Sequence, residues 1–380
     1  DGSLWCIAEN GDEDLGITGD TSPVTSAVQL FANSSLRFVD VSMGRSTFAI
    51  TDNGDVYGFG RNIAGSVNAT EEIVREPQLM SGLQNVVYAE AFYDGACFVS
   101  GTERELLCSG NRGPDIPETA LRPMNLTKVT SLSCTDTHCC AAVDSGEVFC
   151  WGANENKQVS PEGDYIFSPV KVQGLSGPAK QVFVRMTRSC ALMRDTDRTE
   201  CWGNVHDGSQ DIYDDVVSVE EPEDVEIWDS QWDVISVDGG FNVACVSVNN
   251  GPTEPSFYCY GENSYYLLGQ SDPALDETIV PVPVDLNGAQ GVCDANDGVT
   301  AEPTTDEPTT AEPTAEPTTA EPTAEPTTAE PTDTLTLEAE CSSVSRKVFF
   351  DANGDVYVWG RNEFGAFGFD DPLYESFAPE

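Results

Sequence analysis

The sequence predicts an all-β fold built from repeated units, and three observations support this prediction. A short pattern centred on a Trp-Gly-like dipeptide recurs about every fifty residues along the 380-residue chain. Short runs of β-branched and apolar residues precede each copy, and a turn rich in Gly, Asn or Asp separates them from it. Such runs are typical of antiparallel strands, and a period near fifty is in the range of propeller blades.

The glycine of this pattern marks each unit. Clear copies read "VYGFGRN" from Val56, "VFCWGAN" from Val148 and "VYVWGRN" from Val356. The marked position is held by Ala8, Gly60, Gly110, Gly152, Gly203, Gly261 and Gly360. The last interval is about twice the others, because a low-complexity insertion lies within it.

The first half of each unit predicts a hairpin. In "FVDVSMGRSTFAITDNGDVY", residues 38–57, two apolar runs precede the Asn53-Gly54 step, and the same step recurs at Asn353-Gly354. Asn-Gly favours a tight hairpin because both residues tolerate positive φ. We therefore expect antiparallel strands throughout, with little helix.

These units resemble the repeats of the regulator of chromosome condensation family. The resemblance rests on the aromatic-Gly-x-Asn pattern and the Gly-containing turn after it, best kept in residues 359–362 and 367–368, and it covers nearly the whole chain outside the insertion. It implies a seven-bladed β-propeller with one blade incomplete. Residues 1–35 hold only the later half of a blade, so we expect the missing strands beyond Glu380 or in another chain.

Thirteen cysteines accompany the repeats. In the repeat frame Cys190 falls on the second strand of its blade and Cys201 on the third, and facing positions of this kind lie close enough for a disulfide. We expect structural disulfides in the pairs Cys97–Cys108, Cys140–Cys150, Cys190–Cys201, Cys245–Cys259, Cys134–Cys139 and Cys293–Cys341. Cys6 is left for a partner on the missing strand. A redox Cys-x-x-Cys and paired zinc-ligand motifs are absent from the sequence.

A tract rich in Thr, Pro, Glu and Ala, residues 300–332, interrupts the repeats. Its prolines and lack of apolar residues favour polyproline II or disorder. The expected division is 1–296 for propeller repeats, 297–334 for the insertion and 335–380 for the final blade or blades. The composition is typical of an O-glycosylated stalk, with an unmodified spacer as the alternative. The candidate O-glycosylation sites are Thr304, Thr305, Thr309, Thr310, Thr314, Thr318 and Thr319.

Charge and sequons indicate the compartment and the partners. The chain has 18 Lys and Arg against 65 Asp and Glu, a net charge of −47, so nucleic acid and anionic membrane surfaces should be repelled. No apolar run is long enough to span a bilayer, so we expect no membrane insertion. Sequons at Asn33, Asn68 and Asn125, together with the cysteines, indicate an extracellular or cell-surface protein.

We expect no catalytic residue, resident metal or cofactor. His138 lies at a strand-turn position and His206 in an apparent loop, and the sequence places no nucleophile beside either. The acidic run 220–226, read as a solvated loop, leaves room for weak Ca²⁺ binding. Trp228 and Trp232 fall in a blade connector, outside the tryptophan register of the repeats, so they are candidates for an exposed contact surface.

The sequence therefore favours a secreted, non-enzymatic β-propeller that serves as a structural glycoprotein module of a cell surface, wall or extracellular filament. The alternative is a soluble recognition module that binds a protein or glycan through the propeller face. Expected partners are other protein subunits or extracellular glycans, and self-assembly fits the first hypothesis. The family resemblance also implies nucleotide exchange on a small nuclear GTPase and chromatin binding, but the acidity, cysteines and sequons argue against both.

Overall fold

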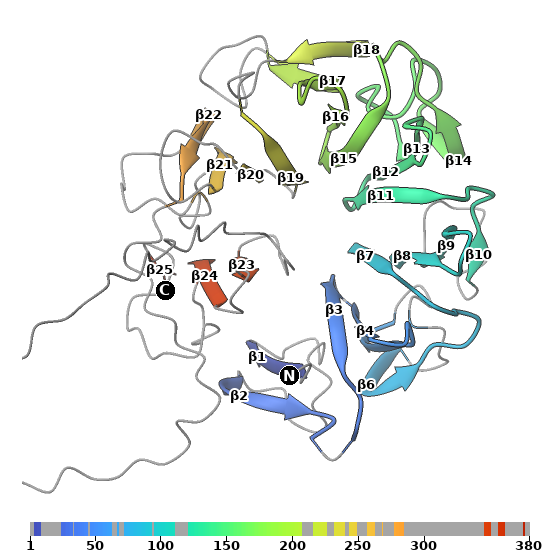
Figure 1. Cartoon of the computed structure of the whole chain (residues 1–380), viewed down its shortest axis with the longest axis vertical. Helices are drawn as coiled ribbons and strands as arrows, with labels where there is room; N and C mark the ends of the chain where they lie inside the picture. Colours follow the sequence, from blue (N-terminus) through green and yellow to red (C-terminus); the bar gives the residue numbers. More distant parts are fainter. Residues whose placement is uncertain are drawn as a thin grey trace, which may run out of the picture.

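The chain forms a ring of antiparallel β-sheets in the computed structural model (Figure 1). Every regular element of the described residues is a strand. None of these residues belongs to a helix long and apolar enough to cross a membrane. The structure describes residues 4–8, 24–32, 34–44, 46–62, 67, 72–92, 95–110, 121–206, 216–225, 232–239, 243–248, 257–262, 268, 277–284, 346–350, 356–361 and 375–376.

Five sheets have four strands each, and we call each of them a blade. The first blade contains β3 (Phe38–Met43), β4 (Ser46–Thr51), β5 (Val56–Arg61) and β6 (Ile73–Leu79). The second contains β7 (Tyr88–Phe92), β8 (Gly95–Ser100), β9 (Glu105–Gly110) and β10 (Arg122–Pro123). The third contains β11 (Val129–Cys134), β12 (His138–Val143), β13 (Val148–Ala153) and β14 (Tyr165–Lys171).

The fourth blade contains β15 (Ala179–Arg185), β16 (Arg188–Met193), β17 (Thr199–His206) and β18 (Val216–Val225). The fifth contains β19 (Val234–Gly239), β20 (Val243–Val248), β21 (Phe257–Glu262) and β22 (Glu277–Pro283). Two smaller sheets pair β1 (Leu4–Ala8) with β2 (Val24–Leu30), and β24 (Val356–Arg361) with β23 (Arg346–Phe350) and β25 (Glu375–Ser376). The predicted all-β propeller is confirmed; with five complete blades among the described residues, the predicted number of seven is not.

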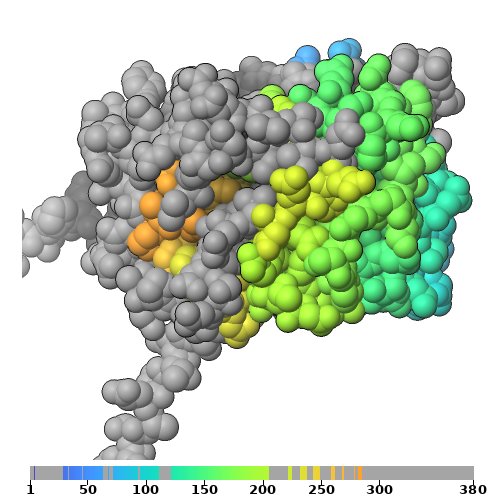
Figure 2. Space-filling view, turned by 90° about the horizontal axis from the view of Figure 1, so that it is seen from above, coloured from blue at the N-terminus to red at the C-terminus, as the bar shows by residue number. Residues whose placement is uncertain are grey.

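Each blade is a meander that runs outward from the centre of the ring. Strands β3, β7, β11, β15 and β19 lie nearest the centre (Figure 1), and the strands that follow them pair in chain order. Seen from the side, the coloured surface follows the sequence around the ring, from cyan through green to yellow (Figure 2).

The apolar cores lie between blades. Every residue of the second strands β4, β8, β12, β16 and β20 is buried, because neighbouring blades cover both faces of these strands. At the junction of the first two blades, Phe48 and Phe98 meet edge to face with ring centroids 5.3 Å apart. Apart from His138 and Arg188 at the starts of β12 and β16, these strands are apolar or small in sequence, and they lack the alternation of a sheet with one wet face.

The repeat glycine is required by the backbone. Gly60, Gly110, Gly152, Gly203 and Gly261 all have positive φ, a conformation that residues with a Cβ rarely adopt. A Cβ at Gly152 would lie 2.6 Å from the Cα of His138, on the paired strand β12. The recurring glycine thus marks the point where the third strand of a blade passes closest to the second.

Neighbouring blades are joined through the exposed backbone edges of their inner strands. Ser131 Oγ accepts a hydrogen bond from Val182 N in the next blade at 3.1 Å. In the following junction, Gln181 accepts from Val237 N at 3.0 Å and donates to Val237 O at 2.6 Å. Ser131 and Gln181 are equivalent, since each is the first paired residue after the bulge of its inner strand.

A second level of the same bonding lies two residues further along. Ser42 Oγ accepts from Ala91 N at 2.8 Å, and Ser133 Oγ accepts from Val184 N at 3.2 Å. An inner strand is an edge strand with unpaired N–H and C=O groups. Polar side chains of one blade therefore satisfy backbone groups of the next, and we call these bonds the inter-blade ladder.

The ladder predicts that Gln181→Ala destabilises the protein. The change removes both bonds to Val237 and leaves its N–H and C=O without these partners, so the free energy of unfolding should fall by about 1–3 kcal/mol. Urea denaturation measures this loss. Gln173→Ala is the matched control, because Gln173 is exposed and its amide donates only to Lys171 O at 3.3 Å. Equal losses in the two variants would refute the role of the ladder.

Candidate functional site

A buried histidine and serine meet where the third and fourth blades join. His138, the first residue of β12, is fully buried, and its Nε2 lies 2.8 Å from Ser189 Oγ on β16. Its Nδ1 lies 3.0 Å from Thr137 Oγ1. The expectation that no nucleophile lies beside this histidine is therefore wrong. The serine is 51 residues away in the sequence, one blade later, so only the ring arrangement brings the two together.

The polarity of this pair does not suit nucleophilic catalysis. Ser189 Oγ donates its proton to Gln158 O at 2.7 Å, so His138 Nε2 donates to Ser189 instead of accepting from it. A general base would take that proton. Ser189 and His138 are both 0% exposed, and Trp202 Nε1 also donates to Gln158 O, at 2.9 Å. The arrangement is a structural network that ties two blades together. The other histidine, His206, ends strand β17 and is not in a loop.

Five disulfides lie in the blades. Cys97–Cys108, Cys140–Cys150, Cys190–Cys201 and Cys245–Cys259 join the second and third strands of four successive blades, at directly facing positions. Cys134–Cys139 joins β11 to β12. These are five of the six predicted pairs; Cys293 and Cys341 lie outside the described residues.

The disulfides fill the cores between blades. Cys97, Cys134 and Cys139 come from two neighbouring blades, yet their sulfur atoms all lie within 4.8 Å of one another. All three are buried in the apolar cluster that joins those blades. Three sulfurs at this spacing would suit a soft metal ion as thiolates, but sulfur in a disulfide is not a thiolate ligand. In the oxidised form these three sulfur atoms pack in the core between the two blades.

The predicted surface sites are only partly covered by the described residues. Asn125 and Thr127 are both exposed between β10 and β11, while Leu126 between them is buried. This sequon is therefore reachable by a glycosyltransferase. Asn33, Asn68, Trp228 and the threonine tract within residues 297–334 lie outside the described residues, so their modification or contact remains a prediction.

Trp232 is half-buried rather than fully exposed. Its ring packs against Tyr258 with centroids 4.5 Å apart, and it covers one edge of the core between the fourth and fifth blades. Most of its role in the described structure is packing. A contact role for its remaining surface stays a prediction.

The acidic run 220–226 was expected to be a solvated loop, and this is wrong. Residues up to Val225 belong to β18, the outer strand of the fourth blade. Charges suit an outer edge strand because they oppose pairing with another chain. Asp224 forms an ion pair with Arg198 at 2.6 Å, so at least one carboxylate already has a cationic partner.

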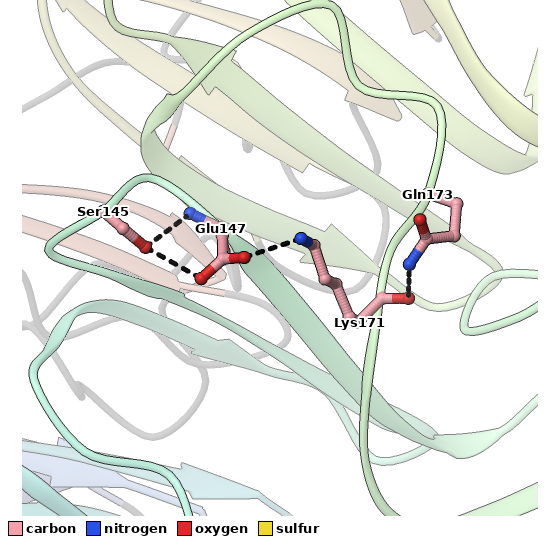
Figure 3. Close-up of polar contacts among 4 residues, drawn as sticks. All are labelled: Ser145, Glu147, Lys171 and Gln173. Carbon is pink, nitrogen blue, oxygen red and sulfur yellow. Dashed lines mark hydrogen bonds and ion pairs between the residues drawn. The ribbon is translucent and has the colours of Figure 1, made fainter.

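A similar polar set joins the turn between β12 and β13 to the end of the outer strand β14 in the third blade (Figure 3). Lys171 Nζ lies 2.6 Å from Glu147 Oε1, and Ser145 Oγ donates to Glu147 Oε2 at 3.0 Å. Hydrogen bonding from Lys171, then from Ser145, lowers the pKa of Glu147 below its usual value. The groups are exposed, so water and salt screen the pair and it adds little to stability. These outer strands offer charged surface and no enclosed site.

The inner strand of the first blade carries a largely buried carboxyl group, that of Asp40. Burial raises the pKa of Asp40 from 3.8 to about 6, an effect opposed by the hydrogen bond from Val41 N at 2.8 Å. Asp40 directly follows the bulge of β3, the position that Ser131 and Gln181 hold in their own strands. The bonds to the next blade that Ser131 and Gln181 make from this position have no described counterpart at Asp40, whose carboxylate accepts from Val41 N.

Apolar side chains are exposed beside Asp40. Val39 on β3 is 59% exposed, and Val87, just before β7 in the next blade, is 58% exposed. Tyr88 beside it is 38% exposed, with its hydroxyl donating to Glu90 at 2.8 Å. The sequence analysis did not identify these residues, since isolated valines in strands are usually buried. The first two blades thus expose three large apolar side chains on or next to their inner strands.

Comparisons with known proteins agree with this architecture. A family model described as "Regulator of chromosome condensation (RCC1) repeat" matches residues 129–158, which run from β11 through β13. The "Secretion-regulating guanine nucleotide exchange factor" of Bos taurus is 26% identical over 196 residues. That match spans 46% of this chain and 41% of the relative, so this chain covers less than half the length of that protein.

Two solved structures share the fold. Human WBSCR16 superposes with a TM-score of 0.71 at 17% identity, over 100% of this chain and 93% of its own. Prp20p from Saccharomyces cerevisiae, described with its binding to Gsp1p and histones, superposes with a TM-score of 0.62 at 18% identity, over 76% of this chain and 74% of its own. Identities this low establish likeness of fold alone.

Asp40→Asn is expected to stabilise the protein at neutral and alkaline pH. Because the folded pKa of Asp40 is raised, its favourable contribution is full below pH 3.8 and is lost as the pH rises through about 6. The amide removes that loss, so stability should rise by roughly 1–3 kcal/mol at about pH 8 and change little at about pH 3.5. Denaturation at both pH values measures it. Exposed Asp195→Asn makes the same charge change, and an equal gain there would attribute the effect to net charge.

Removing one staple is expected to weaken the fold. The double variant Cys190→Ala/Cys201→Ala opens a loop with a sequence separation of 11, and the free energy of unfolding should fall by up to about 3 kcal/mol. Urea denaturation measures the loss. Non-reducing peptide mapping of the unaltered protein should recover the Cys190 and Cys201 peptides joined to each other. Free thiols there, or links to other blades, would contradict the register.

Proposed function

We propose that this RCC1-like β-propeller is a secreted, non-enzymatic structural glycoprotein module of a cell surface, wall or extracellular filament. The family resemblance predicted from the repeats is confirmed by the match to the RCC1 repeat and by the shared fold. The observation that carries the proposal is the set of five buried disulfides in successive blades. Such bonds form and persist in oxidising compartments and are rare in the cytosol.

Two further features support this assignment. Asn125 is exposed within a sequon, which N-glycosylation in the secretory route requires. The net charge of −47 keeps a secreted protein soluble and suits a basic or cation-rich partner. We also propose seven blades. The β1–β2 and β23–β25 sheets would supply parts of the other two, since both lie in the part of the ring between β22 and β3 (Figure 1).

The alternative is a soluble recognition module that binds a protein or glycan through the propeller face. The exposed apolar surface of Val39, Val87 and Tyr88 favours a protein partner, and Prp20p is described with its binding to other proteins. Nucleotide exchange on a GTPase is suggested by the bovine relative. It would ordinarily place these cysteines in a reducing compartment, where disulfides are rare.

The deciding experiment uses protein from its native source, alkylated at lysis. The structural proposal expects the cysteines of the five disulfides to resist alkylation until reduction, a mass loss at Asn125 on enzymatic deglycosylation, and regular polymers in negative-stain images. An oxidised, monodisperse monomer would favour the recognition module instead. Cysteines that alkylate before reduction would overturn secretion, and a GTPase exchange assay would then follow.

A further inference from the structure

The junction between the fourth and fifth blades contains a buried arginine, Arg188. It holds the strand position that the buried His138 holds at the preceding junction. Arg188 begins β16 and faces Gly203, as His138 begins β12 and faces Gly152. Only 6% of Arg188 is exposed. His138 has hydrogen-bond partners on both ring nitrogens, whereas Arg188 Nε is buried with no partner among the described residues.

The fifth blade places a tyrosine toward this arginine. Tyr260 on β21 holds the register position of Trp202 on β17, one residue before the repeat glycine. Trp202 donates to a backbone carbonyl of the preceding blade at 2.9 Å. Tyr260 is 3% exposed, and within the part of the chain that the structure describes its hydroxyl has no partner either. Two hydrogen-bond donors without a described partner, Arg188 Nε and the Tyr260 hydroxyl, are thus buried at the same junction.

The positive charge buried at this junction favours the binding of a negatively charged group. Arg185 also lies here, with its guanidinium carbon 5.7 Å from the centroid of the Tyr260 ring. Burial lowers the pKa of Arg188 from its usual value, and raises that of Tyr260 against the opposing charges of Arg188 and Arg185. No carboxylate among the described residues forms an ion pair with Arg188. An uncompensated buried charge is strongly unfavourable.

We propose that Arg188 and Tyr260 form a subsite for a carboxylate group. The Nε edge of a guanidinium, together with one adjacent Nη, matches both oxygens of a carboxylate, and the Tyr260 hydroxyl supplies another donor. Because both residues are almost fully buried, the smallest carboxylate, formate, and a single acidic side chain are the occupants to test. The carboxylate comes from a free small acid or from an Asp or Glu of a bound protein, and the two sources share this chemistry.

Titration of the whole protein with sodium formate, at constant ionic strength against sodium chloride, tests the subsite by calorimetry. We expect saturable one-to-one binding. Arg188→Gln should weaken binding by about 100-fold and Tyr260→Phe by about tenfold, the usual effect of losing one bond to a charged group. Arg198→Gln is the matched control, because Arg198 is half-exposed, pairs with Asp224 and belongs to the same blade. It should bind formate as the unaltered protein does.

A parallel titration with N-acetyl-glutamate amide distinguishes the sources. Tight binding of this compound with weak formate binding indicates the side chain of a protein partner, and the reverse indicates a free acid. The melting temperature of Arg188→Gln shows whether the variant is folded. Without carboxylate it should be no lower than that of the unaltered protein, because the substitution removes a buried charge. Added formate should raise the melting temperature of the unaltered protein and of Arg198→Gln, and leave that of Arg188→Gln unchanged. No saturable binding of either compound, or equal binding by Arg188→Gln, would overturn the proposal.

Discussion

The propeller depends on how the backbone edges of its inner strands are satisfied. Within a blade the strands pair with one another, but the innermost strand is an edge strand that makes no backbone ladder with the next blade. Ser131, Gln181, Ser42 and Ser133 meet that need with side chains. The same bonds fix the angle between blades, because a side chain reaches its backbone partner at only one separation and tilt.

This constraint explains the chemistry of the cores. The inter-blade ladder holds neighbouring blades close together. The second strands lie between the blades with both faces buried. Disulfides fit this space well, since they are compact, apolar and joined to two strands of one sheet. The close group formed by Cys97, Cys134 and Cys139 shows that sulfur serves in packing between blades as well as in linking strands.

The sequence predicted what is local and missed what joins blades. Strands, turns and the pairing of Cys190 with Cys201 follow from residues within one unit, where register is set by the hairpin and by the repeat glycine. The contact of His138 with Ser189 spans 51 residues, and the electrostatic interaction of Arg188 with Tyr260 also crosses a junction. Such contacts depend on the angle between blades, which no pattern within a unit encodes. The acidic run before Val225 was mistaken for a loop because charges on an edge strand and in a loop look alike in sequence.

One register position varies in a way that matters for assembly. Opposite the repeat glycine, successive blades place chemically unlike residues at the start of their second strands, namely Ser46, Gly95, His138, Arg188 and Val243. A ring of identical junctions would let a blade pair with any other, either within the chain or with a second chain during folding. Here each blade is matched to one neighbour, so mispaired arrangements would bury a histidine or an arginine against the wrong surface. The variation at this position therefore disfavours mispaired blades, although the backbone of the blades repeats.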